Sequence, residues 1–474
     1  MRSVSGLRGI VGEDLVPDVV RRYARGYGAF VAARGGRVVA LARDSRQSGP
    51  AFAAAAADGL TAAGVDVVDL GMVPTPTAQL AVEFLEGGLD GGIIVTASHN
   101  PVEWNALKFV GKGGKFLAKA DAEAFFALVD GGGATAAART GTRRAEAGAV
   151  PFHLARVLGL PWLDVAAIRA RRFRVALDCV RGAGATIMPA LLEALGCEAH
   201  GINLEPDGRF PREPEPIPEH LGELGELVRR TRADIGIAVD PDVDRCALVD
   251  ETGRPIGEDY TLAFAVRAVL GRAGGAAGAG RKGGRQAGEA GPVPVVTNLS
   301  TSLVVDDAAR ECGAVVERAP VGEANVVERM AARRAVVGGE GNGGVILPQV
   351  HLGRDAPVAA TLALALLASR GKGAGTGATV SSVVDASPRY TIVKAKIPRP
   401  PGSLEASYAA LGAALPGADA DRQDGLRLAL ADRWVHVRPS GTEPVVRIIA
   451  EGPTRRDAEA LVERGRAVLD QIGR

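Results

Sequence analysis

The chain has 474 residues, of which 47% are hydrophobic and 23% are charged, a composition typical of globular proteins. Its 56 basic and 55 acidic residues nearly balance, so no basic surface points to nucleic acid or to an anionic membrane as a partner. At roughly 100–200 residues per domain, this length predicts about three or four domains.

Three further features predict a cytoplasmic protein. Residues 1–12 contain no apolar run of the kind found in secretory signals. The longest apolar run, 356–368, is too short to span a bilayer and is typical of a core helix. The four cysteines lie far apart without a CxxC pair, which favours buried reduced thiols over disulfides. They are Cys179, Cys197, Cys246 and Cys312.

Three segments repeat the order of a strand, a helix and a second strand. They cover 37–71, 173–203 and 294–322. Glycine follows each helix, where it fits the left-handed conformation that other residues adopt at a steric cost. These glycines are Gly64, Gly196 and Gly313. Each repeat then runs into a further strand and a polar loop. The pattern predicts three similar mixed α/β domains with their loops turned toward one cleft.

After about residue 380 the pattern changes to alternating strands and a C-terminal amphipathic helix over 455–471, which predicts a smaller α+β domain. We therefore expect four domains around a central cleft. Their boundaries are 1–150, 151–252, 253–380 and 381–474. Three Gly/Ala-rich segments are expected to be linkers or loops. They are 132–142, 271–291 and 370–380.

The first polar loop is TASHNP, residues 96–101, which follows an apolar strand. By itself Ser98 is more typical of a capping residue. A serine hydroxyl becomes a useful nucleophile only when a base or a cation assists it. His99 is either a local hydrogen-bonding partner or a catalytic residue. Beside a cation site, Ser98 would be a candidate carrier of a phosphoryl group.

The second loop, DPDVDR, provides that cation site. Asp240, Asp242 and Asp244 alternate, so their carboxylates can converge on one Mg²⁺ ion. An EF-hand loop would need glycine where Arg245 stands and a preceding helix instead of a strand. A haloacid-dehalogenase-type phosphatase would use the first aspartate as nucleophile and leave Ser98 and the repeats unexplained. An acidic surface turn does not fit the apolar strand that precedes the loop.

The third and fourth loops predict substrate contacts. GGEGNGG, 338–344, supplies Glu340 and Asn342, which suit bidentate hydrogen bonds with vicinal sugar hydroxyls. RPSGTEP, 438–444, could be a plain hairpin turn. However, its arginine and hydroxyl side chains can bind a phosphate, and its glycine lets backbone N–H groups approach closely, which favours an anion site. The residues of this predicted phosphate loop are Arg438, Ser440, Gly441 and Thr442.

Together these loops resemble the α-D-phosphohexomutase family of phosphoglucomutases, phosphomannomutases and phosphoglucosamine mutases, over nearly the whole chain. The resemblance implies that TASHNP is the phosphoserine loop and that DPDVDR, usually DGDxDR, is the metal loop with Ser98 as a further ligand. It also implies that GEGNGG recognises the sugar and RPSGTEP binds phosphate. SGLRG, 5–9, is similar to the family's N-terminal motif, which places Arg8 near the phosphoserine. Lys108 matches a lysine that the family uses in proton transfer.

Two departures bear on the substrate. Some members of the family, notably phosphomannomutase/phosphoglucomutases, have a histidine that closes the sugar loop, where this chain has Gly344. Many of the same members have a lysine before the third-domain loop glycine, where this chain has Pro320 and Val321. EWNALKF after the serine loop is more similar to phosphoglucosamine mutases. The resemblance therefore implies conversion of glucosamine-6-phosphate to glucosamine-1-phosphate, with phosphomannomutase/phosphoglucomutase activity as the alternative.

The implied reaction moves phosphate between C6 and C1 of the hexose through a 1,6-bisphosphate, which also serves as activator. We expect one Mg²⁺ per chain, hexose phosphates as the binding partners, no nucleic acid or membrane partner, and a monomer or homodimer. Arg245 and Arg8 would offset charge on the transferring group. A metal-dependent sugar phosphatase and a non-catalytic sugar-phosphate binding protein are the more distant alternatives.

Overall fold

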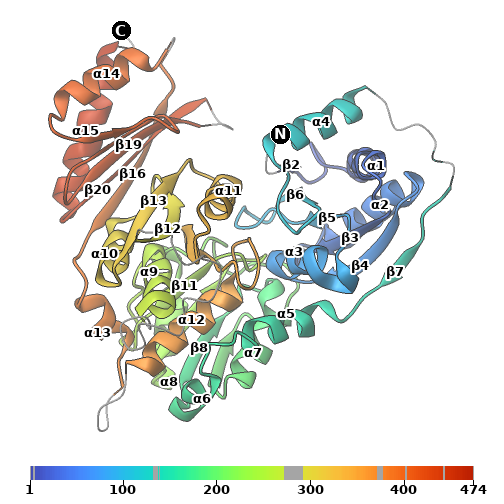
Figure 1. The fold of residues 1–474 in the computed structure, drawn as a ribbon, viewed down its shortest axis with the longest axis horizontal. Coiled ribbons are helices and arrows are strands. Elements are labelled where there is room, and N and C mark those ends of the chain that lie inside the picture. The colour runs from blue at the N-terminus through green and yellow to red at the C-terminus, as the bar shows by residue number, and fades with distance from the viewer. Residues whose placement is uncertain are drawn as a thin grey trace. The chain divides into compact units, whose positions relative to one another are not determined.

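The computed structural model describes residues 2–3, 6–131, 137, 139–271, 292–370, 377–400, 403–440 and 444–472 (Figure 1). The chain divides into two compact units. The first comprises 1–261 and 343–381, and the second comprises 262–342 and 382–474. Two helices carry the chain from one unit into the other: α9 (Glu258–Leu270) and α13 (Val380–Asp385).

A seven-stranded mixed sheet forms the N-terminal part of the first unit, in the order β1-β2-β6-β5-β3-β4-β7. β3, β4 and β5 run parallel, and β6 runs antiparallel to β5. The strands are β1 (Arg2–Ser3), β2 (Gly6–Ile10), β3 (Val38–Arg43), β4 (Asp66–Met72), β5 (Gly91–Val95), β6 (Trp104–Gly111) and β7 (Arg143–Ala145).

Helices cover both faces of this sheet because its central strands are apolar on both sides. On β3, Val39 and Leu41 pack into the core under α1, α2 and α4, whereas Ala40 and Ala42 pack into the core under α3 and α5 (Figure 1). The helices are α1 (Pro17–Ala33), α2 (Gly49–Ala62), α3 (Thr75–Phe84), η1 (Leu85–Gly87), α4 (Lys119–Asp130) and α5 (Ala149–Leu158).

A second sheet in this unit has the order β11-β10-β8-β9. Its strands are β8 (Arg174–Asp178), β9 (Glu198–Ile202), β10 (Ile235–Val239) and β11 (Cys246–Val249). The helices around it are α6 (Val165–Arg171), η2 (Ala183–Thr186), α7 (Met188–Ala194), η3 (Pro218–His220) and α8 (Gly222–Thr231). The unit also includes β15 (Gly344–Ile346) and the apolar helix α12 (Ala356–Ser369).

In the second unit, β13, β12 and β14 lie side by side and run parallel. The elements of this part are β12 (Val293–Asn298), α10 (Leu303–Glu311), β13 (Ala314–Ala319), α11 (Glu323–Arg333) and β14 (Val337–Glu340). The C-terminal part is an antiparallel sheet in the order β16-β20-β19-β18-β17. Its elements are β16 (Thr391–Pro398), α14 (Glu405–Ala414), β17 (Asp419–Asp421), β18 (Leu426–Ala429), β19 (Trp434–Pro439), β20 (Val445–Gly452) and α15 (Arg455–Ile472).

The predicted repeat and fold class are confirmed. Each repeat consists of two parallel strands joined by a helix, and β5, β10 and β14 are the further strands that lead into the polar loops. Gly64, Gly196 and Gly313 follow their helices at φ of 83°, 69° and 69°, as expected for the left-handed position. The four domain boundaries stay a prediction, and most of the three predicted linkers lies outside the described residues.

No helix among the described residues combines the length and apolar character needed to cross a bilayer. The predicted core helix, α12, is instead surrounded by protein, with nearly all of its residues buried.

Candidate active site

Ser98 lies in a short loop after the fully buried strand β5. Its backbone adopts φ 51°, a left-handed conformation that costs a non-glycine residue about 1–3 kcal/mol. The Ser98 amide donates to Thr96 Oγ1 at 3.0 Å, and Thr96 Oγ1 donates to Asp44 Oδ2 at 2.6 Å. These bonds fix the turn from inside, and the Ser98 side chain is buried.

Arg46 also contacts the serine loop through hydrogen bonds to its backbone. Its side chain is 1% exposed and forms an ion pair with Asp44, which is 0% exposed, at 3.2 Å. The guanidinium also donates to four backbone carbonyls at 2.6 to 2.8 Å. They belong to Ser98, Asn100, Pro101 and Trp104. These four hydrogen bonds fix the backbone conformation of the serine loop.

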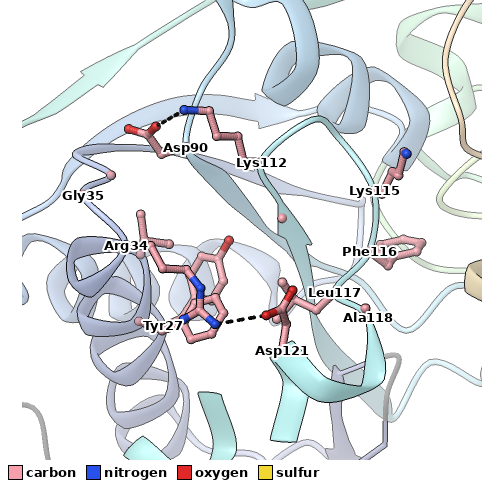
Figure 2. Close-up of a pocket in the computed structure, with 14 residues that line it drawn as sticks. Tyr27, Arg34, Gly35, Asp90, Lys112, Lys115, Phe116, Leu117, Ala118 and Asp121 are labelled. Atoms are coloured by element: carbon pink, nitrogen blue, oxygen red, sulfur yellow. Dashed lines mark hydrogen bonds and ion pairs between the residues drawn. The ribbon is translucent and has the colours of Figure 1, made fainter. Parts of the chain in front are cut away.

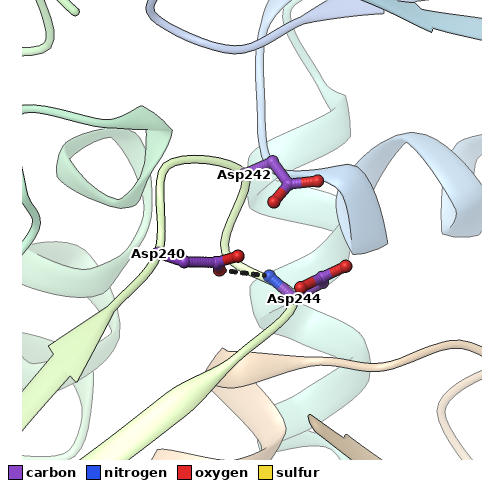
Figure 3. A group of neighbouring side chains, drawn as sticks. All are labelled: Asp240, Asp242 and Asp244. Atoms are coloured by element: carbon purple, nitrogen blue, oxygen red, sulfur yellow. Dashed lines mark hydrogen bonds between the residues drawn. The ribbon is translucent and has the colours of Figure 1, made fainter. Parts of the chain in front are cut away.

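The three aspartates lie in the loop that leaves the buried strand β10 (Figure 3). One ligand oxygen from each lies within 4.8 Å of the others, and all three residues are at most 1% exposed. Asp240 Oδ1 accepts the backbone amides of Asp244 and Arg245, each at 3.1 Å, which closes the loop. The structure therefore brings together the predicted cation ligands.

Ser98 lies against this cluster although 142 positions separate it from Asp240 in the sequence. Its Oγ donates to Asp240 Oδ2 at 2.9 Å. The predicted nucleophile and the predicted cation site therefore belong to one site in the first unit.

Two cations and a hydroxyl surround the remaining aspartates. Lys108 Nζ lies 2.6 Å from Asp242 Oδ2 and 3.6 Å from Asp244 Oδ2. Arg354 donates to Asp244 Oδ2 at 2.6 Å. Thr75 binds Asp242 twice, through its hydroxyl to Oδ2 at 2.7 Å and through its amide to the carbonyl at 2.9 Å.

These neighbours shift the pKa values of Asp240 and Asp242 in opposite directions. Burial and the adjacent Asp244 and Asp242 raise the pKa of Asp240 well above its ordinary value. Burial also acts to raise the pKa of Asp242, but Lys108 outweighs it and holds that pKa below the usual range. Burial acts to lower the pKa of Lys108, yet Asp242 and Asp244 raise it overall.

The residues fit a hard divalent cation. Asp242 Oδ1 and Asp244 Oδ1 are buried and accept no hydrogen bond. A buried carboxylate oxygen without a partner is costly, and a cation relieves that cost. Carboxylate oxygens are the ligands that Mg²⁺ prefers in proteins.

The remaining predicted residues of this unit lie around Ser98. Arg8, on β2, donates to Asn100 Oδ1 at 2.8 Å. His99 Nδ1 is 3.4 Å from Ser98 Oγ. Burial, with Arg245 and Arg8 nearby, holds the pKa of His99 well below its ordinary value, so the ring is neutral near pH 7. Arg245 donates to Glu215 at 2.7 Å.

Sequence reasoning missed five residues that hold this site: Asp44, Arg46, Thr75, Glu215 and Arg354. The first two offered a signal, because DSR follows β3 just as TASHNP follows β5 and DPDVDR follows β10. The other three act across segments distant in sequence, and no local pattern marks them.

The predicted phosphate loop belongs to the second unit, as do Glu340 and Asn342 of the predicted sugar loop, whereas the last two residues of the sugar loop, Gly343 and Gly344, belong to the first unit. Glu340 is buried at the end of β14, where its Oε1 accepts from Asn298 at 2.8 Å and from the Gly322 amide at 3.1 Å. Asn342 follows it and is partly exposed. Arg438, at the end of β19, pairs with Asp424 at 2.9 Å.

Ser440 follows β19, and its amide donates to the Val445 carbonyl at 2.9 Å. Gly441 and Thr442, the other predicted phosphate contacts, lie outside the described residues.

The first unit also has pockets away from its predicted site residues. Figure 2 shows one of about 390 Å³ in the first unit, lined by Tyr27, Arg34, Asp90, Lys112 and Asp121. Four of its charged groups form two ion pairs: Arg34 with Asp121 at 3.0 Å and Lys112 with Asp90 at 3.3 Å. Its lining includes none of the predicted site residues.

Comparison with known proteins gives consistent results along the chain. Family models for domains I, II and III and the C-terminal domain of phosphoglucomutase/phosphomannomutase match in order. They match 2–132, 154–253, 276–389 and 393–468.

Full-length relatives are also similar. A Methanopyrus kandleri protein named as a probable phosphoglucosamine mutase is 36% identical, covering 96% of this chain and 95% of its own. A Thermococcus kodakarensis phosphoglucomutase/phosphomannomutase is 35% identical, covering 98% and 97%. The crystal structure of a phosphoglucomutase/phosphomannomutase family protein from Burkholderia thailandensis has a TM-score of 0.82 at 27% identity, covering 99% and 98%. The chain therefore belongs to the phosphoglucomutase/phosphomannomutase, or α-D-phosphohexomutase, family and is a phosphohexomutase, an isomerase.

Proposed function

We propose that this phosphohexomutase is a phosphoglucosamine mutase, which interconverts glucosamine-6-phosphate and glucosamine-1-phosphate. EWNALKF after the serine loop and Gly344 at the end of the sugar loop support this substrate. A relative of that name, 36% identical, also supports it. The phosphoglucomutase/phosphomannomutase relative at 35% identity supports the alternative.

The observation that carries the proposed phosphoryl transfer is the 2.9 Å contact between Ser98 Oγ and Asp240 within a buried group of three aspartates. We assign one Mg²⁺ to these aspartates, with Ser98 beside it. Magnesium bound there would supply positive charge to the oxygens of a transferring phosphoryl group. The Oδ1 atoms of Asp242 and Asp244, which are buried and accept no hydrogen bond from the described residues, support this assignment.

In the proposed reaction, Ser98 carries a phosphoryl group on Oγ. The bond from phosphorus to Ser98 Oγ breaks as a sugar hydroxyl oxygen bonds to the same phosphorus, which gives a hexose 1,6-bisphosphate. The reverse transfer from the other end returns a phosphoryl group to Ser98. Lys108 exchanges the proton of the sugar hydroxyl, and Arg8 and Arg245 offset the charge of the phosphoryl group. We assign His99 the support of the Ser98 hydroxyl through its neutral ring.

The same reaction needs a site for the phosphate that does not react. We assign that role to the predicted phosphate loop, Arg438 to Thr442, because a guanidinium and hydroxyls suit a phosphate of either sugar orientation. Glu340 and Asn342 would bind the sugar hydroxyls. Of these groups, Glu340 Oε1 already accepts two hydrogen bonds, which fixes the direction of its side chain.

A substrate panel tests the choice of sugar. Glucosamine-, mannose- and glucose-6-phosphate are compared at equal concentration with Mg²⁺ and a trace of the matching 1,6-bisphosphate. The highest kcat/KM is expected for glucosamine-6-phosphate, and clear preference for mannose- or glucose-6-phosphate would favour the alternative. Release of inorganic phosphate in place of the 1-phosphate would contradict the proposed transfer.

A further inference from the structure

A buried polar cluster that the proposed reaction does not use lies in the first unit beneath the metal loop. We name it the His153 cluster; it consists of Thr77, His153, His351 and Asp355, each at most 2% exposed. His153 Nε2 lies 2.8 Å and His351 Nε2 lies 3.0 Å from Asp355 Oδ2, so both imidazoles donate to one carboxylate oxygen. Thr77 Oγ1 lies 2.8 Å from His153 Nδ1.

One end of the cluster is fixed to α3. Thr77 lies two residues after Thr75, at the start of the same helix. Thr75 is the residue that binds Asp242 through its hydroxyl and its amide. A displacement of this end of α3 therefore displaces a partner of Asp242.

The other end is fixed to α12. Asp355 caps that helix by accepting the Val358 amide at 2.9 Å. Its neighbour Arg354 donates to Asp244 Oδ2 at 2.6 Å. Its other neighbour, Ala356, donates its amide to the Val243 carbonyl at 3.1 Å. The start of α12 thus contacts two consecutive residues of the metal loop, Val243 and Asp244.

We propose that the His153 cluster positions the metal loop by coupling α3 to α12, so that Thr75 and Arg354 hold Asp242 and Asp244 at a fixed separation. Two imidazoles and a carboxylate are costly to bury, and apolar side chains of the same volume would fill this place at least as stably. The hydrogen bonds among Thr77, His153, His351 and Asp355 give the cluster a defined geometry, although His351 Nδ1 is buried without a hydrogen-bond partner among the described residues. Groups that orient metal ligands typically change metal affinity by about 10–100-fold when removed.

The inference rests on the proposed cation site, so the test measures binding and not turnover. Mn²⁺, which takes the same oxygen ligands as Mg²⁺, is titrated into the free protein and followed by electron paramagnetic resonance. In His153→Phe, which removes both hydrogen bonds of that ring, we expect Kd to rise about tenfold. His153→Gln retains an N–H donor and is expected to stay within about threefold of wild type.

A matched control separates positioning from stability. Tyr27→Phe removes two buried hydrogen bonds of the same unit, from Tyr27 Oη to the Val110 carbonyl at 2.6 Å and from the Gly92 amide to Tyr27 Oη at 3.1 Å. Tyr27 lines the pocket of Figure 2, whose lining includes no residue of the metal loop. This variant is expected to lower the unfolding temperature and to leave the Kd for Mn²⁺ unchanged. If wild type binds Mn²⁺ and the Kd of His153→Phe equals that of Tyr27→Phe, the positioning role of the His153 cluster is overturned while the cation site stands. Absence of Mn²⁺ binding in wild type would overturn the cation site and the inference with it.

A milder variant covers the case in which His153→Phe does not fold. Thr77→Val preserves shape and breaks only the link to α3. Hydrogen exchange of the Thr75 amide, which donates to Asp242, should then be faster than in wild type, whereas Tyr27→Phe should leave it unchanged. Equal exchange in Thr77→Val and wild type would contradict the coupling.

Discussion

At the scale of single residues, Ser98 depends on Arg46. A serine in the left-handed region costs about 1–3 kcal/mol and persists only where its surroundings determine the backbone. Arg46 supplies those surroundings through its hydrogen bonds to the carbonyls of Ser98 and Asn100 and its ion pair with Asp44. The strained loop and the buried ion pair therefore stabilise each other, and they place Ser98 Oγ beside Asp240.

Replacing Arg46 tests this dependence. Arg46→Met leaves Asp44 as a buried carboxylate without its cation, so the free energy of unfolding should fall by about 3–5 kcal/mol. Arg34→Met is the matched control, because Arg34 and Asp121 form an ion pair with side chains 50% and 48% exposed. An exposed pair contributes at most about 1 kcal/mol. Denaturant unfolding compares the two, and equal losses would contradict the role of Arg46.

At the scale of elements, the hydrophobic patterns predicted the strands and the joining helix of each repeat because each repeat alternates regularly, but they did not predict the helices outside the repeats, such as α1, α4 and α11. They missed α14, since EASYAALGAA is rich in small residues and only Tyr408 and Leu411 give it large buried side chains. They also could not predict how β19 is fixed. His436 in this strand lies 2.8 Å from Ser300 Oγ and donates to the Asp424 carbonyl at 2.7 Å.

His436 makes the stability of the second unit depend on pH. Burial lowers its pKa from 6.5 to about 4. The unfolded chain therefore binds a proton more readily than the folded protein, and stability is full above pH 6.5 and declines as pH falls toward 4. Between pH 7.5 and 5.5 this residue alone should reduce the free energy of unfolding by about 1 kcal/mol.

Thermal unfolding of wild type and His436→Gln at both pH values isolates this contribution. Glutamine cannot take up a proton, so the variant should lose less stability between pH 7.5 and 5.5 than wild type does. Parallel losses in the two proteins would show that His436 is not the titrating group.

At the scale of the whole molecule, the site formed by the loops after β5 and β10 was predicted from the sequence in part. Hydroxyl and carboxylate loops at equivalent strand ends predicted one site, because ligands bind beyond the ends of parallel strands. Thr75, Glu215 and Arg354 escaped prediction because their partners are far away in the sequence and depend on tertiary packing. The reacting groups proposed here all belong to the first unit.

The transfer of phosphate through Ser98 is the central claim, and peptide mass spectrometry tests it most directly. The protein is incubated with glucose 1,6-bisphosphate and Mg²⁺, digested, and compared before and after addition of glucosamine-6-phosphate. The account predicts one phosphoryl group on Ser98 that the sugar phosphate removes, none when Mg²⁺ is chelated, and turnover of Ser98→Ala reduced by about a thousandfold or more. Full turnover by Ser98→Ala, or a Ser98 peptide that never gains phosphate during turnover, would contradict it.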